Sequence, residues 1–380
     1  MRVLLVAALP YPSPQGTQVY LRGLVRALCA AGVDARLACY GYGYGDGEPD
    51  VPVLRAHAPR AGSLRSGLHA DKLAHDLRLA RVVAAARADV VHAHGHEALI
   101  VARLARALGG PRTEAGAPAP IVYTPHTALR AELPRYVGGG VAEGAGPLRP
   151  MVERVLTRLG GVLDDGLPAR AEACVGMSAG TDRLLRDSGV HPAPPVLPGL
   201  DPEDFPERPM PARTPGPARV VYAGNADGYQ DLGVLAAAMR LLRAAHGADA
   251  PRLHVVGRWT KTERDAVAPD VFLDSAGWPE ARAAMDACDA AVVPRATCAG
   301  VPMKLLHAAA LGLPVVVTRP VAMGLPGEVV VAPHDATALA DGIVRACAQP
   351  RGDGAAVVRA HAWAGRVAGL VDAYRATLRG

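Results

Sequence analysis

Short apolar segments of strand type alternate with amphipathic segments of helical period along the whole chain. The strand-like segments cover residues 2–7, 33–39, 89–94, 121–126, 171–177, 218–225, 252–257, 271–274, 290–293, 315–317 and 328–331. Strands that alternate with helices in this way are typical of α/β proteins with parallel sheets. We therefore predict an α/β fold.

The length of the chain and a proline-dense stretch near its middle predict two domains. A chain of 380 residues is too long for one ordinary hydrophobic core. Prolines are dense between residues 191 and 217, and the strand–helix pattern starts again at residue 218. We predict a first domain over residues 1–195, a linker over 196–217 and a second domain over 218–355.

The segment 294–317 is the clearest candidate for a binding site. A buried strand ends just before Arg295, a glycine-containing loop follows, and a helix of about three turns is predicted from Pro302 to Gly312. The unpaired N–H groups in the first turn of a helix bind anions, assisted by the helix dipole. Because Arg295 precedes this turn and Lys304 lies in it, the sequence predicts a pocket for a phosphorylated ligand.

A second ligand-facing element is predicted near the N-terminus. The loop 10–18 connects the first strand to an amphipathic helix and contains Gly16 and Thr17 close to the start of that helix. Glycine allows a ligand to approach the backbone closely. The loop does not have the Gly-x-Gly-x-x-Gly pattern, so a dinucleotide-binding fingerprint is not indicated.

The segment 294–317 also resembles the donor-binding segment of the retaining GT-B glycosyltransferases of family 4. That segment commonly reads Glu-Gly-Phe-Gly-Leu-Pro-Leu-Leu-Glu-Ala-Met-Ala-x-Gly-x-Pro-Val-Val, and residues 300–316 read Gly-Val-Pro-Met-Lys-Leu-Leu-His-Ala-Ala-Ala-Leu-Gly-Leu-Pro-Val-Val. The resemblance extends over nearly the whole chain. It implies two Rossmann-like domains that face each other across a cleft, with a C-terminal helix at about 362–380 packing back on the first domain.

The resemblance also implies a set of donor-binding residues, with two departures from the family pattern. Ala299 and His307 stand where the family has its pair of glutamates. His307 therefore takes the place of a ribose-binding glutamate, and its ionisation would make nucleotide affinity vary between about pH 5.5 and 8. Main-chain amides near the start of the helix would contact sugar or phosphate.

Two cationic positions of the family are neutral in this chain. The arginine and lysine that bind the donor diphosphate fall on Asn225 and Gln230, so other cations near strand ends must neutralise the phosphates. The donor-binding residues predicted on this basis are Gly16, Thr17, Gly224, Asn225, Arg258, Lys261, Gly300, Val301, Pro302, Met303 and His307.

Histidines follow two strand-like segments of the first half. His126 ends the segment 121–126 and matches the family's cleft histidine, which contacts the transferred sugar, so we favour a functional role over a structural one. His92, His94 and His96 alternate and share one side of an extended segment, but only Glu97 accompanies them as a further ligand type. We predict no metal site there.

The resemblance implies a retaining glycosyltransferase that moves a sugar from a nucleotide-diphosphate sugar to a hydroxyl acceptor, which could be a glycan, a lipid or a small molecule. The expected catalytic residues are His126, Arg295 and Lys304, with the two cations stabilising the leaving diphosphate. The scheme needs no metal and no cofactor besides the sugar nucleotide. Alternatives left open are a sugar-nucleotide epimerase, a pseudo-glycosyltransferase and a non-catalytic homologue.

Charge and cysteine usage bear on partners and location. Residues 1–200 hold 22 Lys and Arg against 17 Asp and Glu, whereas the remainder is balanced. The basic first half, including the amphipathic stretch 62–87, leaves open a peripheral membrane contact or simple arginine enrichment. With only 4% aromatic residues, nucleic acid binding is not expected. Six scattered cysteines and no apolar run of membrane-spanning length indicate a cytoplasmic protein.

Overall fold

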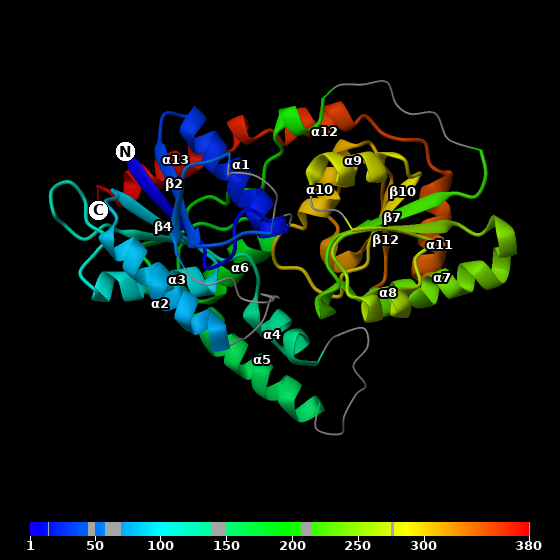
Figure 1. Cartoon of the computed structure of the whole chain (residues 1–380), viewed down its shortest axis with the longest axis horizontal. Helices are drawn as coiled ribbons and strands as arrows, with labels where there is room; N and C mark the ends of the chain where they lie inside the picture. Colours follow the sequence, from blue (N-terminus) through cyan, green and yellow to red (C-terminus); the bar gives the residue numbers. More distant parts are fainter. Residues whose placement is uncertain are drawn as a thin grey trace.

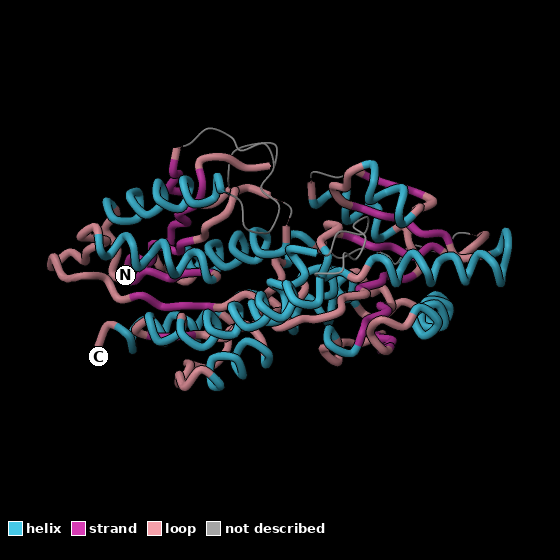
Figure 2. The backbone as a smooth tube through the Cα atoms, turned by 90° about the horizontal axis from the view of Figure 1, so that it is seen from below, coloured by secondary structure: helices cyan, strands magenta, loops and turns pink. Residues whose placement is uncertain are grey.

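The computed structural model describes residues 1–13, 15–44, 50–57, 70–138, 149–206, 215–274 and 277–379. Over these residues the chain forms two lobes, each built around a parallel sheet (Figure 1). Seen from below, the strands of each lobe are enclosed by helices (Figure 2). None of the helices in these residues is long and apolar enough to cross a membrane.

The first sheet has the strand order β3-β2-β1-β4-β5-β6 within the described residues. Its parallel strands are β1 (Arg2–Val6), β2 (Asp34–Tyr40), β3 (Val53–Ala56), β4 (Val90–His94), β5 (Ile121–Thr124) and β6 (Ala173–Cys174). The helices of this half are α1 (Gly16–Ala30), α2 (Ala70–Ala85), α3 (His96–Ala107), α4 (Leu129–Gly138), α5 (Arg149–Gly166) and α6 (Ala179–Asp187), with a short 3-10 turn η1 (Pro168–Arg170).

The second sheet has the order β12-β11-β10-β7-β8-β9, again counting only what the structure describes. Its parallel strands are β7 (Arg219–Ala223), β8 (Arg252–Val256), β9 (Val271–Leu273), β10 (Ala290–Val293), β11 (Val315–Thr318) and β12 (Glu328–Val331). The helices are α7 (Leu232–His246), α8 (Lys261–Val267), α9 (Trp278–Asp286), α10 (Met303–Ala310) and α11 (Ala336–Ala348). Short 3-10 turns are η2 (Pro202–Asp204), η3 (Gly228–Gln230), η4 (Gly247–Asp249) and η5 (Arg319–Val321).

This architecture confirms the predicted α/β fold with parallel sheets, and individual elements differ from the expectation. The edge strand β3 was not predicted, and β6 is only two residues long. The basic stretch 62–87 is described from residue 70 on, where it forms α2. Helix α10 has eight residues, fewer than three turns. It ends just before Gly312, which adopts φ +70°, a left-handed conformation that terminates a helix.

Each sheet is covered on both faces by apolar side chains. Two buried clusters lie on the faces of the first sheet and two on those of the second. The inner strands contribute mostly buried residues, as in β10 and β11, whereas the edge strands β3 and β9 are largely only partly buried. Parallel strands that are buried on both faces read as continuous apolar runs, which is why the sequence pattern identified them.

The C-terminal segment returns from the second lobe to the first (Figure 1). It consists of α12 (Gly354–Ala360), the 3-10 turn η6 (Trp363–Gly365) and α13 (Val367–Thr377). Tyr374 of α13 is fully buried in the core of the first half, and its hydroxyl lies 2.7 Å from Nδ1 of His92. Trp363 fills the space beside Gly23 of α1 and Gly199, where a Cβ atom would overlap its ring.

Candidate functional site

The loop that joins β10 to α10 lies where the two halves of the chain meet. Ser178 donates a hydrogen bond from its hydroxyl to the carbonyl oxygen of Ala299. A Cβ atom on Gly300 would overlap the carbonyl oxygen of His126, and one on Gly180 would lie 2.5 Å from the carbonyl oxygen of Ala299. Glycine is therefore required at both contacts. These contacts bring the end of β5 against the loop that precedes α10.

The N-terminus of α10 has no side-chain cap. Pro302 is the N-cap residue in extended conformation, and Met303 is the first helical residue. On the other side of the interface, Gly16 begins α1, and a Cβ atom on it would lie 3.8 Å from Cγ of Met303. The predicted residues Gly16, Gly300, Val301, Pro302 and Met303 are thus brought together, and the N-termini of α1 and α10 lie close to one another.

Lys304 reaches from the first turn of α10 into a network at the carboxyl end of β7. Its Nζ donates to the Tyr222 hydroxyl (2.9 Å) and to Oε1 of Gln230 (3.0 Å), and it lies 4.1 Å from the centre of the Tyr222 ring. Gly224 has φ +140°, and a Cβ atom there would lie 2.7 Å from this Nζ. Burial, followed by the positive charge of Arg295, lowers the pKa of Lys304 well below its ordinary value.

The two neutral positions in the strand-end loop belong to the same network. Gln230 donates from Nε2 to Oδ1 of Asn225 (3.0 Å), and Asn225 donates from Nδ2 to Asp227 (2.5 Å). The Tyr222 hydroxyl donates to the carbonyl oxygen of Asn225 (2.6 Å). The side chain of Gln230 therefore lies next to an ammonium group that comes from another element, α10.

Arg295 lies at the end of β10, close to this network. Its guanidinium carbon is 4.5 Å from the centre of the Tyr229 ring, and its Nη1 is 3.4 Å from Sγ of Cys298. Its Nε is buried and has no hydrogen-bond partner among the described residues. Burial is the largest influence on its pKa and lowers it, but Cys298, Tyr229 and Glu132 favour the charged form, so the pKa is raised. Arg295 thus provides a permanent charge.

The structure does not bring Arg258 and Lys261 into this network. Arg258 is exposed, and Lys261 is 83% exposed and pairs with Asp265 at 2.7 Å. Trp259, between them, is buried instead and donates from its indole N–H to the carbonyl oxygen of Gly224 (2.8 Å). Tyr222 and Tyr229 were not predicted from the sequence. The pattern that could have identified them is a tyrosine on each side of Gly224, the glycine at the end of the strand.

His126 follows β5 and is surrounded by aromatic side chains. Its Nε2 lies 3.1 Å from Nδ1 of His94, and its ring packs edge-on against Tyr20 of α1, with ring centres 5.2 Å apart. Burial, with a smaller contribution from His96, lowers the pKa of His126 to about 4. Thr17, also predicted here, is only partly buried.

His92 and His94 share one side of β4, as expected, and their ring centres are 4.0 Å apart. His96 begins α3 and lies elsewhere, with Nε2 3.2 Å from Asp164. No group of three or more metal-ligating side chains occurs within the described ranges.

His307 packs between two aromatic residues. Its ring centre is 4.4 Å from Trp278 at the start of α9 and 5.6 Å from Phe205 near the linker. Burial lowers the pKa of His307 to about 4, so the imidazole is neutral at pH 5.5 and above in the ligand-free protein. The expected variation of nucleotide affinity between about pH 5.5 and 8 also depends on the pKa of His307 in the donor complex, and it stays a prediction.

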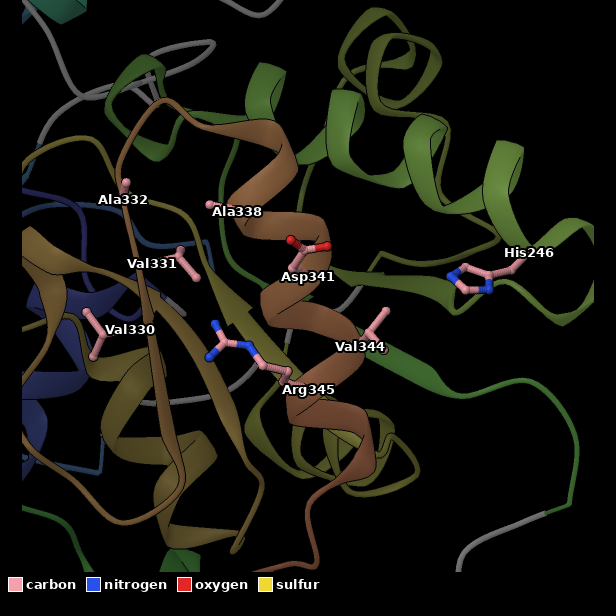
Figure 3. Close-up of a pocket in the computed structure, with 8 residues that line it drawn as sticks. All are labelled: His246, Val330, Val331, Ala332, Ala338, Asp341, Val344 and Arg345. Atoms are coloured by element: carbon pink, nitrogen blue, oxygen red, sulfur yellow. The ribbon is translucent and has the colours of Figure 1, made fainter.

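A separate hollow of about 680 Å³ lies on the second lobe, between α11, β12 and the end of α7 (Figure 3). Its lining includes Val330, Val331, Val344, Asp341 and Arg345. None of the predicted site residues lines it. The single arginine of the hollow, Arg345, is accompanied by Asp341 and by valine side chains. We locate the candidate site instead by the convergence of two basic side chains, helix N-termini and close glycine contacts, because together these features recognise a phosphorylated ligand.

Comparison with known proteins identifies both halves of the chain. Residues 15–200 match the family model of the glycosyl transferase 4-like domain, and residues 217–349 match that of the glycosyl transferases group 1. No curated protein matches the sequence.

Solved structures of similar fold span the whole chain. Sucrose-phosphate synthase from Thermosynechococcus elongatus has a TM-score of 0.73 at 17% identity, covering 99% of this chain and 98% of its own. The α,α-trehalose-phosphate synthase (UDP-forming) from Burkholderia vietnamiensis gives 0.65 at 14% identity and 99% coverage of both chains. HepE from Anabaena, in complex with UDP and glucose, gives 0.63 at 15% identity, with 98% and 100% coverage. At these identities the likeness shows the fold, and it confirms two Rossmann-like domains in GT-B arrangement.

Proposed function

We propose that this chain, whose two halves match the glycosyl transferase 4-like and the glycosyl transferases group 1 models, moves a sugar from a nucleotide-diphosphate sugar to a hydroxyl acceptor with retention at the anomeric carbon. The observation that supports this most directly is the convergence of Lys304, Arg295 and the uncapped N-terminus of α10 beside the ends of β7 and β10. Ligands of open α/β sheets bind at the carboxyl ends of their strands.

The donor diphosphate would bind in this network. Lys304 is buried and its pKa is lowered in the ligand-free protein. A phosphate beside its Nζ would favour the charged form again, because an opposite charge stabilises the ammonium group. The buried Nε of Arg295 has no hydrogen-bond partner in the part of the chain that the structure describes, so its N–H could donate to a second phosphate oxygen. Together with the N–H groups of the first turn of α10, these cations would stabilise the negative charge that develops on the leaving diphosphate.

The transferred sugar would lie between this network and the first half of the chain. His126 is a predicted residue of that half, and its carbonyl oxygen lies against Gly300. We assign it to the sugar and not to the nucleotide. Retention rests on the resemblance to family 4 and follows a front-face transfer, in which the acceptor hydroxyl attacks from the side that the diphosphate leaves. The scheme uses no metal, so turnover is expected to survive EDTA.

A thermal-shift screen of the purified chain tests the donor class. The Anabaena HepE structures contain UDP and UDP-glucose, so UDP-glucose is the first donor to compare with GDP-, ADP- and dTDP-sugars. A cognate donor at 100 times its dissociation constant is expected to stabilise the folded chain by about 2.7 kcal/mol. Absence of a shift with every sugar nucleotide would contradict the proposed donor class, and NMR of the product's anomeric configuration would test retention.

A non-catalytic or atypical GT-B homologue is the second candidate. It is favoured by the loss of four charged family positions, which are occupied by Ala299, His307, Asn225 and Gln230. A chain of this kind would bind the sugar nucleotide without transferring its sugar, whereas an epimerase would change the sugar without any acceptor. Product analysis with and without acceptor distinguishes these outcomes.

A peripheral membrane contact and a cytoplasmic location are further proposals. Helix α5 exposes nonpolar side chains along one face, with two exposed arginines beside them; they are Met151, Val155, Leu159 and Val162, with Arg154 and Arg158. An exposed nonpolar stripe flanked by cations suits the surface of an anionic bilayer. Sedimentation with anionic vesicles is expected to carry the protein down, and neutral vesicles are expected to do so less. Equal absence from both pellets would contradict the contact.

A further inference from the structure

The side chain of His94 contacts that of His126, and the geometry assigns His94 a role in the site. We propose that His94 donates a hydrogen bond from Nδ1 to Nε2 of His126, and so holds His126 in the tautomer that carries its hydrogen on Nδ1. His94 is then a positioning residue, and His126 offers an N–H donor to an oxygen of the ligand. The catalytic consequence rests on the proposed function, whereas the tautomer itself does not.

The two rings form a close pair that the parallel sheet dictates. His94 is the last residue of β4 and stands opposite Thr124, the last residue of β5. His126 follows two residues later, and its Nε2 lies 3.1 Å from Nδ1 of His94. Two neutral imidazoles at this distance share one hydrogen, so one ring donates and the other accepts.

The surroundings of His94 decide which ring donates. Its other nitrogen, Nε2, is buried and has no hydrogen-bond partner among the described residues, and the side chain as a whole is only 3% exposed. A neutral histidine has a single N–H, and a buried N–H without an acceptor loses the hydrogen bond that water would provide. His94 avoids this loss by carrying its hydrogen on Nδ1, where His126 accepts it.

The described groups around His94 offer its Nε2 no acceptor. The His92 ring stacks on it at 4.0 Å, but both nitrogens of His92 are engaged, Nδ1 with the Tyr374 hydroxyl (2.7 Å) and Nε2 with the Thr124 hydroxyl (2.8 Å). The Tyr20 ring, from α1, faces His94 at 5.8 Å between ring centres. Burial lowers the pKa of both His94 and His126, so the pair is neutral at ordinary pH.

The tautomer can be measured without any assay of turnover. Long-range ¹H–¹⁵N correlation spectra of the full chain with ¹⁵N-labelled histidine distinguish a protonated from a bare ring nitrogen, and His126→Gln assigns the signal. We expect a protonated Nδ1 and a bare Nε2 for His126 in the wild-type chain. A protonated Nε2 on His126, with the N–H of His94 on Nε2 toward Tyr20, would overturn the proposal.

Two variants test the role of His94 in the reaction. His94→Asn keeps an amide donor near the place of Nδ1, and His94→Leu keeps bulk without a donor. We expect the asparagine variant to keep the wild-type tautomer and turnover. In the leucine variant, His126 should populate its other tautomer. The kcat should fall about threefold to tenfold, which corresponds to the loss of one hydrogen bond, and the KM for the donor should change little.

The outcomes separate a positioning role from a packing role. If His94→Leu keeps both the wild-type tautomer and kcat, or if asparagine and leucine lower kcat equally while the tautomer stays unchanged, His94 acts only by packing and the proposal is wrong. Should His94→Leu fail to fold, the wild-type spectrum and His94→Asn still decide. A wild-type chain with no turnover but the expected tautomer would instead refute the proposed function.

Discussion

Lys304 is the residue on which the proposed donor site depends most. Its ammonium group is the point at which α10, β7 and η3 meet, through Tyr222 and Gln230. Charge-assisted hydrogen bonds to phosphate contribute about 1.5–3 kcal/mol each. Other basic residues that the sequence placed near strand ends, such as Lys261, are turned to solvent.

We predict that Lys304→Met weakens binding of the cognate sugar nucleotide at least tenfold, because the variant removes a charge-assisted contact and leaves the phosphates without it. Isothermal titration calorimetry measures the affinity. Lys261→Met is the matched control, since it removes the same charge from an exposed residue paired with Asp265, and its affinity should equal that of the wild type. Equal affinities of Lys304→Met and wild type would exclude Lys304 from the phosphate site.

Exchanging two side chains tests whether donor affinity depends only on the charge in the network or also on the helix that carries it. Nζ of Lys304 lies 3.0 Å from Oε1 of Gln230. Exchanging the two residues, in the double variant Gln230→Lys with Lys304→Gln, returns an ammonium group to the same network from the other element. We expect it to recover at least part of the affinity lost in Lys304→Gln alone, again by calorimetry. A double variant as weak as the single one would mean that the position on α10 is essential.

At the scale of the elements, close approaches between helices depend on particular glycines. A Cβ atom on Gly23, within α1, would overlap the indole of Trp363 in η6. Gly233, within α7, has no atom within 4 Å of the same hypothetical Cβ. Both are helical glycines, so they share the backbone effect of substitution and differ in packing.

We therefore predict opposite effects for the two alanine substitutions. Gly233→Ala should stabilise the chain by about 0.4–1 kcal/mol, because alanine restricts the unfolded chain and favours the helix. Gly23→Ala should destabilise it by about 1–3 kcal/mol, because the indole must move out of a packed site. Urea unfolding gives both free energies. A Gly23→Ala variant as stable as Gly233→Ala would show that Trp363 in η6 can move away from α1 without loss of stability.

At the scale of the whole molecule, both halves bury histidines in the neutral form. Burial lowers the pKa of His92 to about 3 and those of His126 and His307 to about 4. In the unfolded chain these groups return to about 6.5. Above that pH neither state binds the protons. Below it the unfolded state takes them up and the folded state does not, so protonation favours unfolding.

We predict that the free energy of unfolding falls as the pH is lowered from about 6.5 to 4, with each such histidine contributing up to about 1.4 kcal/mol per pH unit. His307→Phe should reduce the slope of the free energy of unfolding against pH by about the contribution of one histidine. The phenylalanine ring can still pack against Trp278 and Phe205. Urea unfolding at several pH values measures the slope. An unchanged slope in His307→Phe would mean that His307 is already protonated in the folded protein over this range.

Local patterns in the sequence were enough to predict the class of fold and to mark candidate ligand sites. Strand and helix periods are local properties, and parallel strands buried on both faces leave continuous apolar runs that can be read directly. The carboxyl ends of those strands follow from the same pattern. This is why the segment around Arg295 and Lys304, the end of β5 at His126 and the start of α1 could be marked as candidate sites. It is also why the resemblance to family 4 was visible in residues 300–316.

Which of those side chains meet depends on contacts between distant parts of the chain. The contact of Lys304 with Gln230 joins residues 74 apart in the chain, and the pair His94–His126 joins neighbouring strands. Such contacts depend on the order of strands in the sheets and on the packing of the two halves, neither of which leaves a local period in the sequence. For the same reason the solvent exposure of Lys261 and the aromatic packing of His307 were not foreseen. A charge near a strand end does not reveal whether it faces a ligand or water until the neighbouring elements are in place.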